Sequence, residues 1–406
     1  MSTENPLAVL ENDAFCSILS LIDFFDLNLR KSAVRACVNM ALSASSKDYI
    51  KKFILPAIPS LTNMTKVFSI FLKMFKLSGN SDIEKSILDK GILCFFYIVY
   101  NIKNYGVQNQ DPEIFQKVMQ YGLLDNLFEV LSNFLKIMND NEVKTGGNNK
   151  DLNISQDTLK NIIKIFNIIS NCSSEISNLI LNMNILEIIY SIISKEMATS
   201  TTTTESDGKS KLGSTYHTVF VEIFSLLQSL FPEKKCKKLV KLIDPNNKHF
   251  LVYFSEKILN TLISNIVSNP STNTLLQVIK LVETYIFFSN KEQILAYVDP
   301  INLSNVASKM LDSKDTSYIF QIFELIDLIM SKCPEGFITS FIREGVVHNM
   351  KFLLEIDENV LYIPTSDYPN DINYLKNKKS NILNILKSGG DLSNIDFNDL
   401  EEGNYN

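Results

Sequence analysis

Tryptophan is absent from the 406 residues, and histidine occurs only 3 times. The 6 cysteines, at positions 16, 37, 94, 172, 236 and 333, never form a CxxC pair. Zinc sites combine closely spaced cysteine and histidine ligands, so no metal site is predicted. Cysteines that lie far apart in apolar surroundings are typical of reduced core residues, which predicts a protein of the nucleus, the cytoplasm or both.

Sequence motifs of common catalytic and cofactor-binding sites are also missing. No GxxxxGK[ST], GxGxxG, HExxH or GxSxG string occurs, so nothing would cradle a phosphate or activate a water molecule. We therefore predict no catalytic residue and no cofactor in this chain. The basic run KKCKKLVK, at 234–241, has two interpretations: a nuclear-import signal or phosphate contact, and a solvated helix start.

Neither a basic surplus nor a long apolar run is present. The formal net charge is −6, whereas nucleic-acid-binding proteins normally have a positive surplus. The longest apolar run, at 92–100, is well short of the roughly 20 residues of a membrane span. The N-terminal residues lack the basic and apolar regions of a secretory signal. These absences predict a soluble protein whose partners are other proteins, not nucleic acid or membrane.

Helical periodicity dominates what is present, because 13 glycines and 11 prolines interrupt the chain only rarely. Apolar residues recur at i, i+3, i+4 and i+7 in the segments 158–170, 275–288 and 318–330. This spacing places the apolar side chains on one face of a helix. Strand-like alternation between turn residues does not recur, so an all-α protein is predicted.

Polar segments separate the predicted helices. Two low-complexity insertions, about 139–153 and 197–211, contain too little apolar surface to offset the entropy of ordering them, and both are predicted to be disordered. The tail at 357–406 is polar and acidic. It is predicted to be mostly disordered, with one short amphipathic helix at 372–388.

A short corner motif repeats between the predicted helices. A residue that turns the backbone easily is followed by two apolar residues, two variable ones and a further apolar one at Asp13, Gly122, Asn184 and Gly345. Further versions occur at Pro56, Asp244 and Asn302. Asp13 to Pro56 and Asn302 to Gly345 both span 43 positions, within the 40–47 residue period of armadillo and HEAT repeats.

The repeating corner predicts the architecture of residues 1–356. About seven units, some of them degenerate, would form an all-α armadillo/HEAT-like helical-repeat superhelix, a solenoid with a long concave face. His348, beside the Arg343-Glu344-Gly345 corner, occupies the same position of the repeat as Cys16, Asp125 and Glu187. Such a mixed position is expected to face solvent, so catalysis by His348 is not expected.

Asparagines and an arginine are the candidate binding residues. Arg35, Asn39 and Asn171 are predicted near the ends of helices that line the concave face. A carboxamide there can donate to and accept from the backbone of an extended peptide. The alternative is that the asparagines cap helix C-termini. An importin-type groove, in which tryptophan and asparagine alternate to bind basic peptides, is disfavoured because tryptophan is absent.

Three stretches share specific strings with one known family. Residues 19–64 contain Asp23-Phe24-Phe25, residues 333–350 contain the string REGVVH, and residues 216–233 form the helix between them. Taken in the order of the sequence, the three stretches resemble the armadillo region of HECT-type ubiquitin ligases. The class is the one of ubiquitin-fusion degradation, which includes the plant KAKTUS and animal thyroid-receptor-interacting ligases. The similarity is colinear over roughly 7–356.

The resemblance implies a role in substrate binding for these residues, but not the ubiquitin transfer that the family catalyses. Family members transfer ubiquitin through a C-terminal HECT cysteine, while the armadillo region engages substrates and substrate-linked ubiquitin. The HECT domain is absent from these residues, and Cys333, before Pro334, is expected in an inter-helix loop. The chain is expected to be a fragment, a split gene product or a stand-alone paralogue.

Two functions remain open at this point. The chain is either the substrate-recognition scaffold of such a ligase or a free armadillo adaptor that binds proteins outside the ubiquitin system. In the first case its partners would be protein substrates or degron peptides, ubiquitin, and a separate HECT-containing chain.

Overall fold

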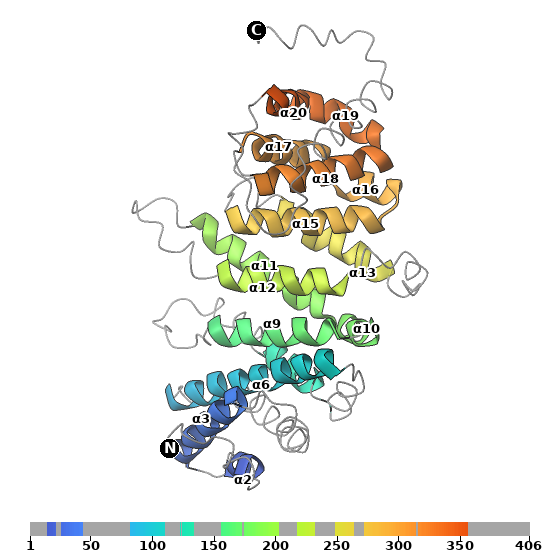
Figure 1. Cartoon of the computed structure of the whole chain (residues 1–406). Helices are drawn as coiled ribbons and strands as arrows, with labels where there is room; N and C mark the ends of the chain where they lie inside the picture. The colour runs from blue at the N-terminus through green and yellow to red at the C-terminus, as the bar shows by residue number, and fades with distance from the viewer. Residues whose placement is uncertain are drawn as a thin grey trace, which may run out of the picture. The chain divides into compact units, whose positions relative to one another are not determined.

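Figure 1 shows the computed structural model of the chain, in which every described element is a helix. The structure describes residues 14–21, 26–43, 82–109, 122, 124–133, 156–172, 174–202, 217–231, 248–263, 272–313 and 316–355. The chain divides into two compact units, Met1–Leu230 and Phe231–Asn406, which we call unit 1 and unit 2. The predicted all-α fold class is confirmed.

Unit 1 is built around four long helices that pack in sequence order. These are α3 (Leu27–Ser43), α6 (Asp82–Asn109), α9 (Gln156–Ser170) and α12 (His217–Leu230). Each packs against the next (Figure 1). The shorter or peripheral helices are α2 (Ala14–Ser20), α10 (Ser174–Asn182), α11 (Ile185–Thr202) and a helix at 124–133.

Unit 2 contains two consecutive three-helix groups after an opening helical segment. The opening segment comprises α13 (Lys248–Tyr253) and the π-helix η5 (Phe254–Leu259). The first group is α15 (Thr272–Phe288), α16 (Lys291–Tyr297) and α17 (Pro300–Leu311). The second is α18 (Thr316–Lys332), α19 (Pro334–Arg343) and α20 (Val346–Glu355). Helix α15 packs on α18 and α17 packs on α20.

The same helix order recurs in both units. A long helix, a short helix and a further helix follow one another as α9, α10 and α11 in unit 1, and twice more in unit 2. Each group alone would leave an apolar face exposed, and packing on the neighbouring group buries it. The predicted helical repeat is therefore present within each unit.

Three of the predicted corners have the backbone that the sequence pattern implies. The φ angles are +72° at Gly122, +60° at Asn184 and +78° at Gly345. This left-handed conformation favours glycine and asparagine. The carbonyl oxygen of each corner residue accepts a hydrogen bond from the start of the next helix, at 3.3 Å from Asn126 N, 3.1 Å from Glu187 N and 3.0 Å from Asn349 N. Corners at Asp13, Pro56 and Asp244 lie outside the described residues.

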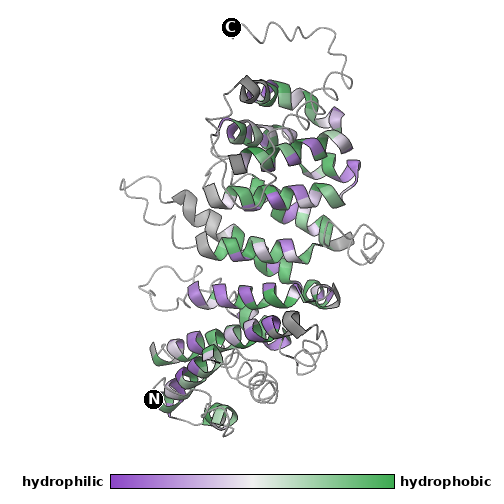
Figure 2. Ribbon diagram, in the orientation of Figure 1, coloured by the Kyte–Doolittle hydropathy of each residue, from purple (hydrophilic) through white to green (hydrophobic). Residues whose placement is uncertain are grey.

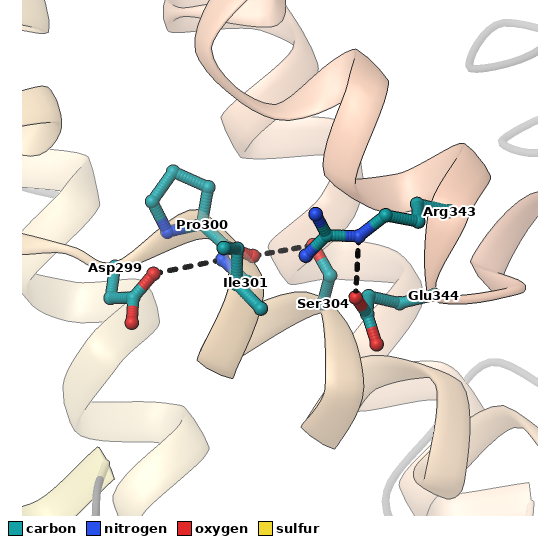
Figure 3. Close-up of polar contacts among 6 residues, drawn as sticks. All are labelled: Asp299, Pro300, Ile301, Ser304, Arg343 and Glu344. Carbon is teal, nitrogen blue, oxygen red and sulfur yellow. Dashed lines mark hydrogen bonds and ion pairs between the residues drawn. The ribbon is translucent and has the colours of Figure 1, made fainter.

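The corner predicted at Asn302 is wrong. Asn302 lies inside α17, which begins at Pro300 with Asp299 as its N-cap. The Asp299 carboxylate accepts a hydrogen bond from Ile301 N at 3.0 Å, and the hydroxyl of Ser304 donates to the carbonyl of Pro300 at 2.6 Å (Figure 3). Aspartate followed by proline is a strong helix start, and it places the corner three residues earlier than the apolar pattern did.

Each unit has its own apolar core. In unit 1, Phe95 of α6 and Phe166 of α9 are 1% and 0% exposed. In unit 2, the ring of Phe231 packs edge-on against Phe250 and Phe254, with centroids 5.0 and 5.1 Å away. Figure 2 shows that α12 is mostly hydrophobic on the side in view, whereas α3 and α9 mix hydrophobic and hydrophilic residues. On the side in view, α3 and α9 therefore present more hydrophilic residues than α12 does.

The insertion predicted at 197–211 begins later than expected. Helix α11 continues through residues 197–202, because Met197 and Ala198 extend a strongly apolar helix at little cost. The rest of that segment, the insertion at 139–153, the tail at 357–406 and the helix expected at 372–388 lie outside the described residues. Among the described helices, none alone is long and apolar enough to cross a membrane, although the bent pair Ile176–Asn182 and Ile185–Ser194 passes on length and composition together.

Candidate binding face on the long helices of unit 1

Contacts between neighbouring helices show that α6, α9 and α12 run in the same direction. Asp89 and Phe96 of α6 contact Thr158 and Lys164 of α9 in the same order. From α9 to α12, Lys164 pairs with Glu222 and Ser170 bonds to Ser229, again in the same order. From α3 to α6, the side chain of Asn101 donates to the carbonyl of Ala41 at 2.8 Å. Residues at equal heights therefore form rows across α6, α9 and α12.

Lys164 marks one such row. Its ammonium lies 5.4 Å from the centre of the Phe96 ring on α6 and 3.4 Å from the Glu222 carboxylate on α12. Its side chain is 29% exposed, and that of Glu222 is 18% exposed. A half-exposed lysine that contacts both neighbouring helices identifies the solvent side of the layer. We call this side the long-helix face of unit 1.

Three aromatic side chains of α6 lie on this face. The rings of Phe96 and Tyr100 stack with centroids 6.0 Å apart, and Tyr97 lies 5.5 Å from Phe96. Tyr100 is 46% exposed, whereas Phe95 on the opposite side of the helix is buried. Aromatic rings supply a large contact area at a low cost in conformational entropy, so these residues could anchor a ligand.

Arg35 and Asn39, both predicted binding residues, are exposed on α3. They lie one turn apart on a polar stripe whose opposite side contains the buried Val34 and Cys37. Helix α3 packs against α6, and the hydrogen bond from Asn101 to Ala41 joins the second half of α6 to the last turn of α3. The structure thus places Arg35 and Asn39 on the exposed side of α3, and their role in binding stays a prediction.

Asn171, the third predicted binding residue, follows the last residue of α9 and is exposed. Its side-chain nitrogen donates to the carbonyl of Asn167 at 2.7 Å and to the Asn167 side-chain oxygen at 3.0 Å. This is the geometry of a helix C-terminal cap, the alternative that the sequence left open. The side-chain oxygen of Asn171 stays available as an acceptor, so capping and ligand contact are compatible.

The corner at Gly345 is a structural feature. His348 is exposed, as predicted from its position in the repeat. Arg343 Nε lies 3.0 Å from Glu344 Oε1, a pairing of adjacent residues on the surface (Figure 3). Asn349 donates to the carbonyl and hydroxyl oxygens of Ser308 on α17, at 3.0 and 3.1 Å, and so fixes α20 against α17. These contacts build a turn between packed helices.

Four of the described cysteines, Cys37, Cys94, Cys172 and Cys333, are poor nucleophiles. Burial raises the pKa of Cys37 to about 12 and that of Cys172 to about 11. The pKa values of Cys94 and Cys333 are also raised, chiefly by burial. Cys333 lies between α18 and α19, as predicted, and is 0% exposed. A thiol with a raised pKa is protonated near neutral pH, whereas thioester formation requires a thiolate.

Metal ligands do not gather in the part of the chain that the structure describes. No group of three or more His, Cys, Asp or Glu side chains there could hold an ion. Cys236 and the basic run at 234–241 lie outside the described residues. The long-helix face of unit 1 presents charged, amide and aromatic side chains.

Two ubiquitin-protein ligases of Arabidopsis thaliana are similar to the chain over most of its length. E3 ubiquitin-protein ligase UPL3 is 22% identical over 407 residues, which cover 91% of this chain and 19% of the ligase. The chain is a distant homologue of these ligases. E3 ubiquitin-protein ligase UPL4 is 19% identical over 359 residues, 88% of this chain and 21% of the ligase. The family resemblance predicted from REGVVH and the other strings is confirmed, and the chain spans about a fifth of the relatives' length.

Solved structures similar to the chain include engineered and designed proteins. An engineered protein is 13% identical with a TM-score of 0.41, covering 96% of this chain and 92% of that one. A designed armadillo repeat protein in complex with the peptide (KR)4 is 13% identical with a TM-score of 0.32, covering 92% and 99%. No protein-family model matches the sequence.

Sequence reasoning missed the aromatic side chains of α6. Residues 92–100 were considered only as an apolar run too short for a membrane span. Phe96 and Tyr100 are four positions apart, and Tyr97 lies beside them, so all three fall on one side of a helix. The spacing of these rings within the run was the signal that could have predicted an aromatic surface.

Proposed function

We propose that the chain is the substrate-recognition region of a HECT-type ubiquitin ligase system, and that it binds proteins or ubiquitin-linked substrates for ubiquitin-dependent degradation. The observation that supports this most directly is the colinear similarity to two ubiquitin-protein ligases over about nine-tenths of the chain. The protein would act in the nucleus, the cytoplasm or both, with catalysis supplied by a HECT domain on another chain or on the rest of a longer one.

The side chains of the described residues agree with binding rather than catalysis. Burial raises the pKa of Cys37, Cys94, Cys172 and Cys333, which disfavours a ubiquitin thioester on any of them. The long-helix face of unit 1 presents Arg35 and Lys164 with exposed aromatic rings, the combination on which protein interfaces often depend. The chain would therefore select the substrate, and another domain would modify it.

A fusion experiment tests the proposed function. The whole chain is joined to a HECT catalytic domain and incubated with an E1 and an E2 enzyme, ubiquitin and a cell extract. Proteins that acquire ubiquitin are identified by mass spectrometry and compared with those modified by the catalytic domain alone. We expect a distinct set of modified proteins that also co-purify with the isolated chain. An unchanged set of modified proteins would contradict a role in substrate selection.

The alternative is an adaptor that acts outside the ubiquitin system. It predicts partners that co-purify with the chain but lack ubiquitin conjugates and are not stabilised by proteasome inhibition. A separate assay addresses catalysis by the chain itself: incubation with a ubiquitin-charged E2 should yield no adduct that a thiol reductant releases.

A further inference from the structure

We propose that the long-helix face of unit 1 binds an extended, acidic protein segment in which an apolar side chain lies midway between two carboxylates. This inference rests on the proposed function, because it names the chemistry of the segment that the scaffold would recognise. Arg35 would meet one carboxylate, the ring pair of Phe96 and Tyr100 would meet the apolar side chain, and Lys160 with Lys164 would meet the second carboxylate.

The charge of this face selects an acidic segment. Helix α3 contains Arg30, Lys31 and Arg35 and no aspartate or glutamate. The second half of α6, residues 93–109, contains Lys103 and no acidic residue. Helix α9 adds Lys160 and Lys164; its Asp157 lies in the first turn, and Glu222 of α12 pairs with Lys164 at 3.4 Å. Complementary charge accelerates encounter and discriminates against basic partners, although the whole chain is acidic.

The aromatic surface selects an apolar side chain between the carboxylates. Tyr100 is 46% exposed and stacks on Phe96, which in turn receives the Lys164 ammonium over its ring at 5.4 Å. Leu42, at the end of α3, is 56% exposed. Large apolar side chains flanked by charges form a surface that gains from desolvation when an apolar side chain covers it. A leucine or phenylalanine in the segment would provide that cover.

The helix spacing sets the spacing of the motif. Packed helices lie about 8–10 Å apart, and an extended chain advances about 3.3 Å per residue. A segment that crosses the parallel helices at a right angle therefore moves from one helix to the next in about three residues. Phe96 and Lys164 lie in one row on α6 and α9, and α3, with Arg35 on its exposed side, packs on α6. The predicted order is therefore acidic residue, two variable residues, apolar residue, two variable residues, acidic residue.

Amide side chains near the same row could hold the segment's backbone. Asn39 lies one turn after Arg35, and Asn104 one turn after Tyr100, and both are exposed. Asn167 of α9 accepts a hydrogen bond from Asn171, which leaves its own amide nitrogen free to donate. Carboxamides can pair with the N–H and C=O groups of an extended chain, and such contacts fix its register without reading its side chains.

The binding experiment uses the whole chain and short labelled peptides. The reference peptide has an aspartate, a leucine and a glutamate separated by two serine or glycine residues each. Its variants replace both acids by lysine, replace leucine by serine, or bring the acids two residues closer together. Fluorescence anisotropy at low salt should show the reference binding at least tenfold more tightly than the lysine variant and about threefold more tightly than the other two.

Protein variants locate the site. Arg35→Glu should weaken the reference peptide about tenfold and should partly restore binding of a peptide whose first acid is lysine. Tyr100→Ser should weaken the reference without changing the salt dependence of binding. Lys280→Glu, also a change from a basic to an acidic side chain but on a long helix of unit 2, is the control and should leave the affinity within twofold. Circular dichroism confirms that each variant is folded.

Specific outcomes would overturn this inference. Equal binding of the reference and lysine peptides would remove the acidic preference, and equal losses in Arg35→Glu and Lys280→Glu would remove the site. Stronger competition by a single-stranded RNA oligonucleotide than by the reference peptide would assign the basic face to nucleic acid instead. If the fusion experiment still changes the set of modified proteins, the scaffold role stands while its assignment to acidic segments fails.

Discussion

Unit 1 and unit 2 share a helix order but display different side chains on their long helices. The long-helix face of unit 1 presents Arg35, aromatic rings and Lys164. The long helices α15 and α18 of unit 2 instead contain Glu283, Glu324 and Asp327, and the side chain of Gln321 donates to Glu283. The two units thus share the order of their helices, whereas a few residues on the long helices decide which kind of ligand each unit can bind.

The two units also tie their long helices together differently. In unit 1, the neutral amide of Asn101 donates to the carbonyl of Ala41 near the end of α3. In unit 2, the ammonium of Lys332 donates to the carbonyls of Ile286, Phe287 and Ser289 at the end of α15, at 2.7, 2.6 and 2.8 Å. Cations are favoured at helix C-termini, although burial lowers the pKa of Lys332 because desolvation penalises its charge.

The largest effect should come from Lys332→Met, which removes the charged tie of unit 2. We expect a loss of about 2 kcal/mol of unfolding free energy, because three carbonyl oxygens lose their donor while part of the gain is already offset by desolvation. Urea unfolding followed by circular dichroism measures the loss. Lys280→Met, on a half-exposed position of α15, is the control and should change the stability by less than about 0.5 kcal/mol. Equal stabilities of the two variants would show that the tie contributes nothing.

Asn101→Leu tests the corresponding neutral tie of unit 1. It should cost about 1–2 kcal/mol, since a buried carbonyl loses its partner, and hydrogen exchange at the end of α3 should accelerate. Asn104→Leu, one turn away on the exposed side of α6, should be nearly neutral. A loss larger than that of Lys332→Met would reverse the ranking of the two units.

Corner substitutions compare the glycine of unit 2 with the asparagine of unit 1. Gly345→Ala should cost about 1 kcal/mol, because a Cβ atom is unfavourable at a φ of +78°. Gly345→Asn should cost less, because Asn184 adopts a φ of +60° at the equivalent corner. Thermal unfolding gives the order of the two variants. If alanine were tolerated as well as asparagine, the left-handed backbone would not be what determines the corner residue.

Alkaline pH should weaken unit 1 by a small amount. The pKa of Cys37 is raised from 9.0 to about 12, and that of Cys94 is raised as well, so both thiols hold their protons more tightly when folded. Their contribution to stability is complete below pH 9 and is lost progressively above it; for Cys37 the loss continues up to about pH 12. At pH 9.5 the loss is under about 1 kcal/mol per thiol. The loss is measured from urea unfolding midpoints between pH 7 and 9.5, for the unchanged chain and for the double variant Cys37→Ala, Cys94→Ala. Equal pH dependence of the two proteins would show that these thiols do not cause the loss.

Local signals in the sequence predicted the corners correctly. Gly122, Asn184 and Gly345 stand out because a left-handed residue precedes a fixed apolar pattern, and both signals act within a few positions. The same reasoning failed at Asn302, where the apolar pattern was followed and the stronger start signal of Asp299 and Pro300 was overlooked. Exposure of His348 also followed from the repeat, since positions that accept unlike residues rarely pack in a core.

Contacts between helices could not be predicted in the same way. The row from Phe96 through Lys164 to Glu222 joins residues that are 68 and 58 positions apart in the sequence. Their alignment depends on how buried side chains set the height of one helix against the next, and periodicity within a helix carries no such information. Arg35 and Asn39 are predicted from the sequence as binding residues near helix ends, but the stacked rings of Phe96 and Tyr100 on the neighbouring helix appear only in the structure.

The parallel arrangement of α6, α9 and α12, with α3 packed on α6, has a consequence for selectivity. Within this layer, a ligand shifted by one helix meets a similar backbone at each step, so the scaffold alone would let an extended chain slide. Only the unequal side chains of this face, a guanidinium, a pair of rings, an ammonium and a carboxylate, distinguish one alignment from the next. Replacing any of them by its neighbour's type should therefore broaden the range of sequences bound before it abolishes binding.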